Sequence, residues 1–252
     1  MVFIHLNMKK ARIGIFDSGI GGLSALKEIK KLMPNVSCVY LGDNGNAPYG
    51  NRTLNDLFPL AMRGIDKLLS EDLCCIVVAC NTLSVNLLGK LKEYSPVPLF
   101  GVFPPVEKVL INRGGCLLLS TERTAERYDG IKKIMAKGVK GLVSDIEKNV
   151  FNFDEVFLDK YFAKEKDCVN FGRKYPLILG CTHFSLIKNK FFDYFCPPQI
   201  LMGETYTANM VQKFLSGLNK SDIYCKNSTL FLGDYADFNN EVWSQVVNFV
   251  KK

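Results

Sequence analysis

The sequence has little of what a metal site, a membrane span or a secretion signal requires. Its 252 residues include only two histidines and one tryptophan, and no C-x-x-C pair occurs, which argues against zinc. No apolar run approaches the roughly 18 residues of a membrane span, and Val2–Leu6 is shorter than the core of a signal peptide. We therefore expect no metal, no membrane segment and no leader, and we interpret residues 1–7 as a frayed extension without function.

The charged residues form no block of one sign. The formal net charge of +7 comes from 32 Lys and Arg against 25 Asp and Glu, spread along the whole chain. A nucleic-acid-binding protein usually concentrates its basic residues on one face or in one segment. We therefore expect no nucleic-acid partner, and we interpret the positive charge as an aid to solubility or as mild steering of anionic substrates.

Cysteine is abundant, with nine copies at irregular positions. In a chain without a leader, this pattern favours free thiols in a reducing compartment, so we predict a cytoplasmic protein. Most cysteines are small buried hydrophobic residues, and Cys74 and Cys75 are interpreted as packing residues on an inner strand. The same buried role is expected for Cys38, Cys116, Cys168, Cys196 and Cys225.

Short apolar runs alternate with helical patterns along the chain. The runs are rich in Ile, Val and Leu and predict buried strands, while segments such as Leu23–Leu32 have the apolar spacing of a helix. This alternation predicts an α/β fold with mainly parallel sheets. The predicted strands are Arg12–Phe16, Val36–Gly42, Cys75–Ala79, Val97–Val102, Cys116–Leu119, Val139–Val143, Pro176–Gly180, Gln199–Met202 and Thr229–Gly233.

Two segments 101 residues apart repeat one pattern. Ile76–Ser84 and Leu177–Ser185 each comprise a strand, a small residue, a cysteine, a polar pair and the start of a helix. Two such copies predict two pseudosymmetric α/β domains with the active site in the cleft between them, because open α/β sheets place their sites at the carboxyl ends of strands. We predict a first domain over 1–102 plus 214–252 and a second over 103–213, joined by crossovers near 96–105 and 203–218.

Cys80 and Cys181 differ from the other cysteines because each stands at a predicted switch from strand to helix. A helix N-terminus favours an anion, so we expect both thiols to be reactive and to have a lowered pKa. His183 is interpreted as the acid-base partner of Cys181, with Asp17 as the counterpart on the Cys80 side. A cysteine hydrolase is the competing interpretation, but it gives no role to the second cysteine.

Two turns can bring backbone amides to an anion. Asp17–Gly22 follows the first predicted strand, and its N–H groups and the Ser18 hydroxyl can point at an anionic group. The motif is neither a dinucleotide fingerprint nor a phosphate loop, and a capped turn without a ligand is the alternative. In Asn46–Gly50, Pro48 and Gly50 can bring amides near a carboxylate, although this motif alone is more typical of a plain loop.

Four motifs follow one another along the chain, namely Phe16–Gly22, Pro48–Gly50, Ala79–Thr82 and Gly180–His183. In this order and at these separations they resemble glutamate racemases of the aspartate/glutamate racemase superfamily. The histidine favours the glutamate enzymes, since aspartate racemases typically carry a glutamate there. The resemblance implies a cleft between two α/β domains, a homodimer, and neither pyridoxal phosphate nor metal. The chain departs from the family at Leu201–Glu204, where an Asp-Ser-Gly is usual, and in a shortened second domain.

The resemblance also implies residue roles. Cys80 would take the α-proton of D-glutamate and Cys181 that of L-glutamate, each returning a proton to the opposite face of a planar intermediate. Asp17 and His183 match residues that assist the thiols, and Glu147 is the best match to a family glutamate that follows a proline-rich segment. The matches to substrate-binding positions are Asp17, Ser18, Pro48, Tyr49, Gly50, Asn81, Thr82, Thr121, Thr124, Thr182 and His183.

The resemblance thus implies an isomerase that supplies D-glutamate for peptidoglycan synthesis. Two alternatives stay open from the sequence. One is a racemase or decarboxylase of another small carboxylate such as aspartate, and the other is a weakly active relative that binds a partner such as DNA gyrase. The presence of both cysteines and the histidine argues against pure binding, because holding a ligand does not require two opposed thiols.

Overall fold

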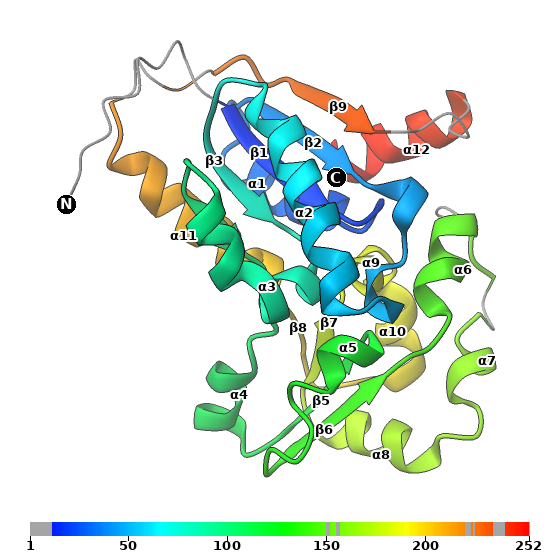
Figure 1. The fold of residues 1–252 in the computed structure, drawn as a ribbon. Helices are drawn as coiled ribbons and strands as arrows, with labels where there is room; N and C mark the ends of the chain where they lie inside the picture. Colours follow the sequence, from blue (N-terminus) through cyan, green and yellow to red (C-terminus); the bar gives the residue numbers. More distant parts are fainter. Residues whose placement is uncertain are drawn as a thin grey trace.

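The computed structural model describes residues 12–149, 152–154, 157–219, 223, 225–233 and 240–251, so the prediction about residues 1–7 lies outside the described part. Nine strands form two sheets in this part, and helices surround both sheets (Figure 1). The first sheet contains β1 (Arg12–Asp17), β2 (Cys38–Gly42), β3 (Leu73–Val78), β4 (Leu99–Gly101) and β9 (Thr229–Gly233). The second contains β5 (Cys116–Ser120), β6 (Ile134–Gly138), β7 (Leu177–Gly180) and β8 (Ile200–Met202).

The α-helices of the described part alternate with the strands. They are α1 (Leu23–Leu32), α2 (Leu54–Leu69), α3 (Asn81–Tyr94), α4 (Val106–Arg113), α5 (Glu122–Ala125), α6 (Leu142–Asn149), α7 (Asp159–Phe162), α8 (Lys166–Lys174), α9 (Thr182–Leu186), α10 (Lys188–Phe195), α11 (Gly203–Ser216) and α12 (Asn240–Lys251). Two short 3-10 turns, Asn44–Asn46 and Tyr49–Asn51, follow β2. None of these helices combines the length and the apolar character needed to cross a membrane.

The two sheets share one topology. Their strand orders are β4-β3-β1-β2-β9 and β6-β5-β7-β8, and all their pairings are parallel. If the first four strands of each sheet are matched in chain order, both sheets place the third strand between the first and the fourth. The predicted α/β fold with parallel sheets is therefore confirmed, and the repeated segments occupy equivalent positions, on β3 and on β7.

The predicted strand at Val139–Val143 is wrong. The strand in this region is β6, which ends at Gly138, and Leu142 already begins α6. Leu142, Val143 and Ile146 are buried on one face of α6, and Val139 is buried in the connection before that helix. Strand β6 lies at the edge of its sheet and is only half-buried, so it lacks the apolar run that marks an inner strand.

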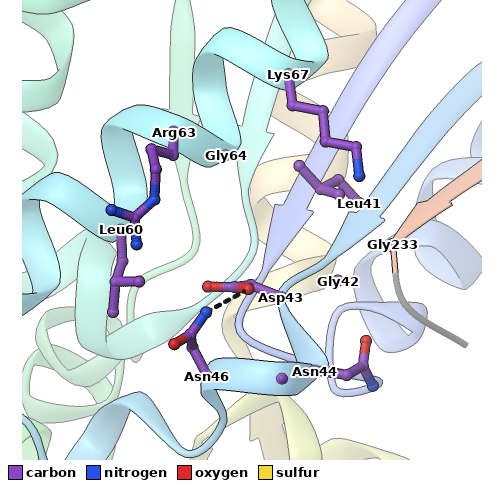
Figure 2. Close-up of a pocket in the computed structure, with 11 residues that line it drawn as sticks. Leu41, Gly42, Asp43, Asn44, Asn46, Leu60, Arg63, Gly64, Lys67 and Gly233 are labelled. Carbon is purple, nitrogen blue, oxygen red and sulfur yellow. Dashed lines mark hydrogen bonds between the residues drawn. The ribbon is translucent and has the colours of Figure 1, made fainter.

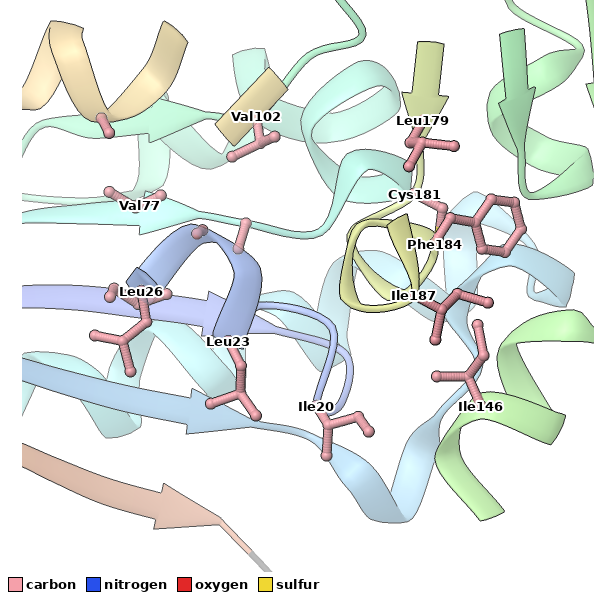
Figure 3. Packing of buried hydrophobic residues seen from close by; sticks show 14 of the residues in the cluster. Ile20, Leu23, Leu26, Val77, Val102, Ile146, Leu179, Cys181, Phe184 and Ile187 are labelled. Carbon is pink, nitrogen blue, oxygen red and sulfur yellow. The ribbon is translucent and has the colours of Figure 1, made fainter. Parts of the chain in front are cut away.

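One hydrophobic cluster joins the layers around both sheets. It includes Leu26 of α1 beneath the first sheet, Leu179 of β7, and Phe184 of α9. Figure 3 shows Leu26 on one side of the view and Leu179 and Phe184 on the other, where Ile146 of α6 lies beside Ile187. A second cluster packs α2 and α3 on the other face of the first sheet. The continuous cluster packs α9 against the first sheet. It thereby also fixes the position of Cys181, the residue that precedes this helix.

Burial of the cysteines follows the prediction except at two positions. Cys38, Cys116 and Cys168 are buried, as are Cys74 and Cys75 on β3. The prediction is wrong for Cys196 and Cys225, which are exposed. Cys196 ends α10 in the left-handed conformation, with φ 46°, and Cys225 lies in the loop before β9. Both are connecting positions on the surface, where a residue's apolar character does not determine its burial.

Candidate active site

Two cysteines stand at equivalent carboxyl ends of strands. Cys80 follows β3 and immediately precedes α3, and Cys181 follows β7 and immediately precedes α9. Both are 5% exposed and line the same small cavity, between the first and second sheets. The other lining residues are Ser18, Pro48, Tyr49, Gly50, Asn81, Thr82, Thr121, Val143, Thr182 and His183. The structure therefore brings together nearly all the residues that the sequence singled out.

The cavity is closed. Its volume of about 10 Å³ accommodates at most one water molecule, so an amino acid enters only if the two sides move apart. Hydrogen bonds cross the cleft: Thr182 Oγ1 donates to Asp17 Oδ2 at 3.0 Å, and the hydroxyls of Thr82 and Thr121 lie 3.1 Å apart. These bonds tie the first-sheet side to the second-sheet side around both thiols.

His183 lies between a thiol and a carboxylate. Its Nδ1 is 4.0 Å from Cys181 Sγ, and its Nε2 is 2.5 Å from Glu147 Oε1. Burial alone would lower the pKa of His183, but the interactions with Cys181 and Glu147 hold this pKa well above its usual value. The arrangement therefore places a positively charged imidazolium beside Cys181. In this arrangement the carboxylate of Glu147 orients the imidazole of His183, and the imidazole contacts the Cys181 thiol. Such a chain of three groups is typical of a site with an activated nucleophile or base.

Glu147 reaches across the cleft from α6. Besides His183, it accepts a hydrogen bond from the Ile20 backbone N–H at 2.9 Å and one from Asn44 Nδ2 at 3.3 Å. The Gly19 N–H donates to Asp17 Oδ1 at 3.1 Å. Two donors of the glycine-rich turn, expected to face a ligand anion, are thus taken by carboxylates of the chain itself.

The glycines of that turn allow this close approach. A Cβ added at Gly19 would lie 1.8 Å from Glu147 Oε1, and one added at Gly21 would lie 2.4 Å from His183 Nδ1. Neither position can therefore carry a larger residue unless the dyad of Glu147 and His183 moves. The glycines serve the packing of site residues rather than an unusual backbone conformation.

The Cys80 side has a different electrostatic environment. Burial and the Asp17 carboxylate raise the pKa of the Cys80 thiol to about 12, so the predicted lowering by the helix N-terminus is wrong for Cys80 in this closed state. Burial likewise raises the pKa of Asp17 to about 6, although His183 opposes that rise. The site therefore favours a neutral thiol at Cys80 and a charged imidazolium beside Cys181.

The predicted substrate-binding groups have several partners already. Thr121 Oγ1 donates to Thr124 Oγ1 at 3.2 Å, and Asn81 Nδ2 donates to the Val102 carbonyl at 3.0 Å. The Asn81 Oδ1 atom is buried and has no hydrogen-bond partner in the described part of the chain. The Tyr49 hydroxyl donates to Asp43 Oδ2 at 2.5 Å. Several donors that were predicted to bind substrate are therefore paired with groups of the chain itself in this structure.

Two residues at the site were not predicted from the sequence. Val143 of α6 lines the cavity, and its helical position was hidden by the wrong strand prediction. Asn44 is the second residue after the carboxyl end of β2, and sites of parallel sheets gather at such strand ends, so this position was a signal for it. In the described ranges, no group of three or more His, Cys, Asp or Glu side chains is arranged to hold a metal ion.

Two parallel sheets of like topology, each presenting a cysteine at a strand end to one closed cleft, define a two-thiol α/β enzyme site. No protein-family model matches the chain. It is 32% identical over 200 residues to the glutamate racemase of Clostridium perfringens strain SM101, covering 74% of this chain and 76% of the relative. It is 28% identical over 250 residues to that of Clostridium novyi strain NT, covering 94% and 96%.

Solved structures agree with the sequence relatives. The glutamate racemase of Thermus thermophilus in complex with β-chloro-D-alanine has a TM-score of 0.71 at 27% identity, covering 96% of this chain and 94% of that one. The Francisella tularensis enzyme in complex with D-glutamate has a TM-score of 0.76 at 23% identity, with the same coverage, and shares the fold. The chain belongs to the glutamate racemase family. The predicted enzyme class, an isomerase, is confirmed.

Proposed function

We propose that this chain interconverts L- and D-glutamate by moving one proton at a time between the substrate's α-carbon and two cysteines, Cys80 and Cys181. The observation that carries the proposal is the placement of both thiols on one cavity, each at the carboxyl end of an equivalent strand in a different sheet. An acid or base on each face of the α-carbon is what inversion of that carbon requires.

The electrostatics support a defined resting state. One thiolate and one thiol must be present together, because one group removes the α-proton while the other supplies a proton. The imidazolium of His183, held by Glu147, places a positive charge beside Cys181, and the raised pKa of Cys80 keeps that group a thiol. This state is ready for L-glutamate, from which Cys181 would take the proton.

The steps balance in both directions. The Cys181 thiolate accepts the α-proton of L-glutamate and leaves the electron pair on the α-carbon, and the Cys80 thiol then donates its proton to the opposite face. D-glutamate leaves with Cys80 as the thiolate and Cys181 as the thiol, and the reverse reaction restores the first state. Hydroxyls of Ser18, Thr82 and Thr182 would stabilise the charge that grows on the substrate carboxylate.

The wider role follows from this activity and from the family. We assign the chain to the cytoplasm as a homodimer that supplies D-glutamate for peptidoglycan synthesis, in line with its free cysteines. Residues 1–102 with 214–252, and residues 103–213, would be the two bodies that separate to admit substrate. The small volume of the cavity, which cannot hold an amino acid, supports such a movement.

Loss of optical activity tests the proposal. Purified chain incubated with L-glutamate, without added cofactor, should drive the circular dichroism signal to zero, and in deuterium oxide the product should carry deuterium at the α-carbon. L-aspartate and L-alanine serve as parallel substrates. An unchanged signal with glutamate, together with turnover of aspartate, would assign the chain a different acidic substrate.

A further inference from the structure

A second and larger cavity, called the outer cavity below, lies outside the cleft that holds Cys80 and Cys181, which is called the thiol cleft. Its volume is about 230 Å³, and it lies between α2 and the carboxyl ends of β2 and β9 (Figure 2). Gly42 and Gly233, the paired last residues of these two strands, contribute only backbone to one wall. The volume is below the roughly 300–1,000 Å³ of sites for drug-sized molecules, so the cavity suits a small metabolite.

One wall of the cavity is positively charged. Arg63 and Lys67 are one helical turn apart on α2 and both line the cavity, and Figure 2 shows the Lys67 side chain extending from the helix toward Leu41 of β2. Neither cation makes a hydrogen bond or an ion pair with any residue in the described ranges. Two cations at this spacing can each take one carboxylate or share a dianion.

The facing wall carries one negative charge. The carboxylate of Asp43 lines the cavity opposite α2, held by Asn46 Nδ2 at 2.9 Å and by the Tyr49 hydroxyl at 2.5 Å. Asp43 forms no ion pair with Arg63 or Lys67, so the opposite charges face each other across the space without meeting. The amides of Asn44 and Asn46 add neutral donors and acceptors beside it.

We propose that this cavity binds an acidic α-amino acid at a second site, separate from the thiol cleft. Two cations on one wall and one carboxylate on the other are the charge complement of a ligand with two carboxylates and one ammonium group. A simple anion would satisfy Arg63 and Lys67 but would be repelled by Asp43. The ammonium group of an amino acid provides the partner that Asp43 lacks on its cavity side.

The two cavities share one loop. Residues 43–46 line the outer cavity, and residues 48–50 of the same loop line the thiol cleft. Asn44 donates to Glu147, which contacts His183, and the Tyr49 hydroxyl, from a residue that lines the thiol cleft, donates to Asp43. A ligand that bridges α2 and Asp43 therefore contacts the same loop, residues 43–50, that forms part of the thiol cleft.

Calorimetric titration of the full chain tests the site. Racemisation releases no net heat, since enantiomers have equal enthalpy, so L-glutamate can be titrated into active protein. We expect two binding events per chain, of which one is weakened at least tenfold in R63A/K67A, because each charged hydrogen bond is worth about tenfold in affinity. The matched control is K90A/K92A, which removes the same charge from exposed positions on α3 outside the cavity.

Ligand analogues separate an amino-acid site from a plain anion site. Glutarate lacks the ammonium group and should bind the outer site about tenfold more weakly than L-glutamate, since one charged contact is lost. Inorganic phosphate binding as tightly as glutamate, and lost in R63A/K67A, would overturn the amino-acid assignment. A single event of equal affinity in wild type and R63A/K67A would overturn the site itself, and it would do so whether or not the chain racemises glutamate.

Discussion

The two cysteines of the cleft differ from the other seven because each follows an inner strand and precedes a helix. Cys80→Ala and Cys181→Ala should each lower kcat for racemisation by roughly 10²-fold or more, because each removes the thiol that exchanges the α-proton on one face. Circular dichroism measures the loss in both directions. Cys196→Ala, at an exposed helix end, is the control and should keep wild-type turnover. Near-normal kcat in either cleft variant would refute the two-base scheme.

His183 should assist Cys181 rather than cap its helix. No side-chain capping bond occurs at the start of α9, and the imidazole instead contacts Cys181 and Glu147. His183→Asn should lower kcat in the L-to-D direction by at least tenfold, about 1.4 kcal/mol of barrier. The kcat/KM values of the two directions must still be equal, because the equilibrium constant is one. A kcat within about twofold of wild type in both directions would remove His183 from the mechanism.

Glu147 should set the pH range of the L-to-D reaction. Its contact with Nε2 helps to hold the pKa of His183 well above the usual value, so the imidazolium persists at neutral and higher pH. Glu147→Gln removes that charge and lowers the pKa of His183, so the imidazolium is lost at lower pH. The alkaline limb of kcat/KM for L-glutamate should therefore move to lower pH. An alkaline limb that stays in place would show that Glu147 serves only the contacts to Ile20 and Asn44.

At the scale of elements, the start of α11 holds a carboxyl group that the mechanism does not use. Glu204 is 1% exposed, its Oε1 accepts a hydrogen bond from Ser24 of α1 at 2.8 Å, and its Oε2 has no partner in the described ranges. Burial raises the pKa of Glu204 from 4.5 to about 7. Its contribution to stability is therefore complete below pH 4.5 and is lost as pH rises to about 7.

Glu204→Gln should remove this pH dependence. At pH 8 the variant should be more stable than wild type by roughly 1–3 kcal/mol, because the buried carboxylate charge is gone while Ser24 keeps an acceptor. Below pH 4.5 the two proteins should be about equally stable, since Glu204 is then neutral. Denaturant unfolding at both pH values measures the difference. Glu93→Gln, at an exposed position of α3, is the control.

The elements show what sequence could and could not predict. Inner strands such as β3 and β7 are continuous apolar runs, so both strands, and the placement of a cysteine at the end of each, could be predicted from the sequence. The half-buried edge strand β6 has no such run. The buried residues after it, Val139 in the connection and Leu142 and Val143 in α6, were mistaken for a strand. Glu147 was found only through the family resemblance, because its meeting with His183 depends on how α6 packs against α9.

For the whole molecule, closure determines which thiols solvent can reach. Cys196 and Cys225 are exposed, whereas Cys80 and Cys181 become accessible only when the cleft opens. Alkylation followed by mass spectrometry should modify the exposed pair at least tenfold faster. Thr182→Val removes the 3.0 Å bond to Asp17 across the cleft, so it should accelerate modification of Cys80 and Cys181 alone. Equal rates at all four cysteines would mean that the cleft is predominantly open in solution.

The matching strand orders of the two sheets bear on the handedness of the reaction. A duplicated unit offers two similar half-sites related by rotation, but the two enantiomers are related by reflection, which no rotation reproduces. Exact copies of one half-site could therefore not treat left- and right-handed substrates as equals. Here one thiol is accompanied by a carboxylate and the other by an imidazolium dyad. The enzyme should consequently saturate at different concentrations of the two enantiomers and turn them over at different maximal speeds, while still leaving an even mixture at the end.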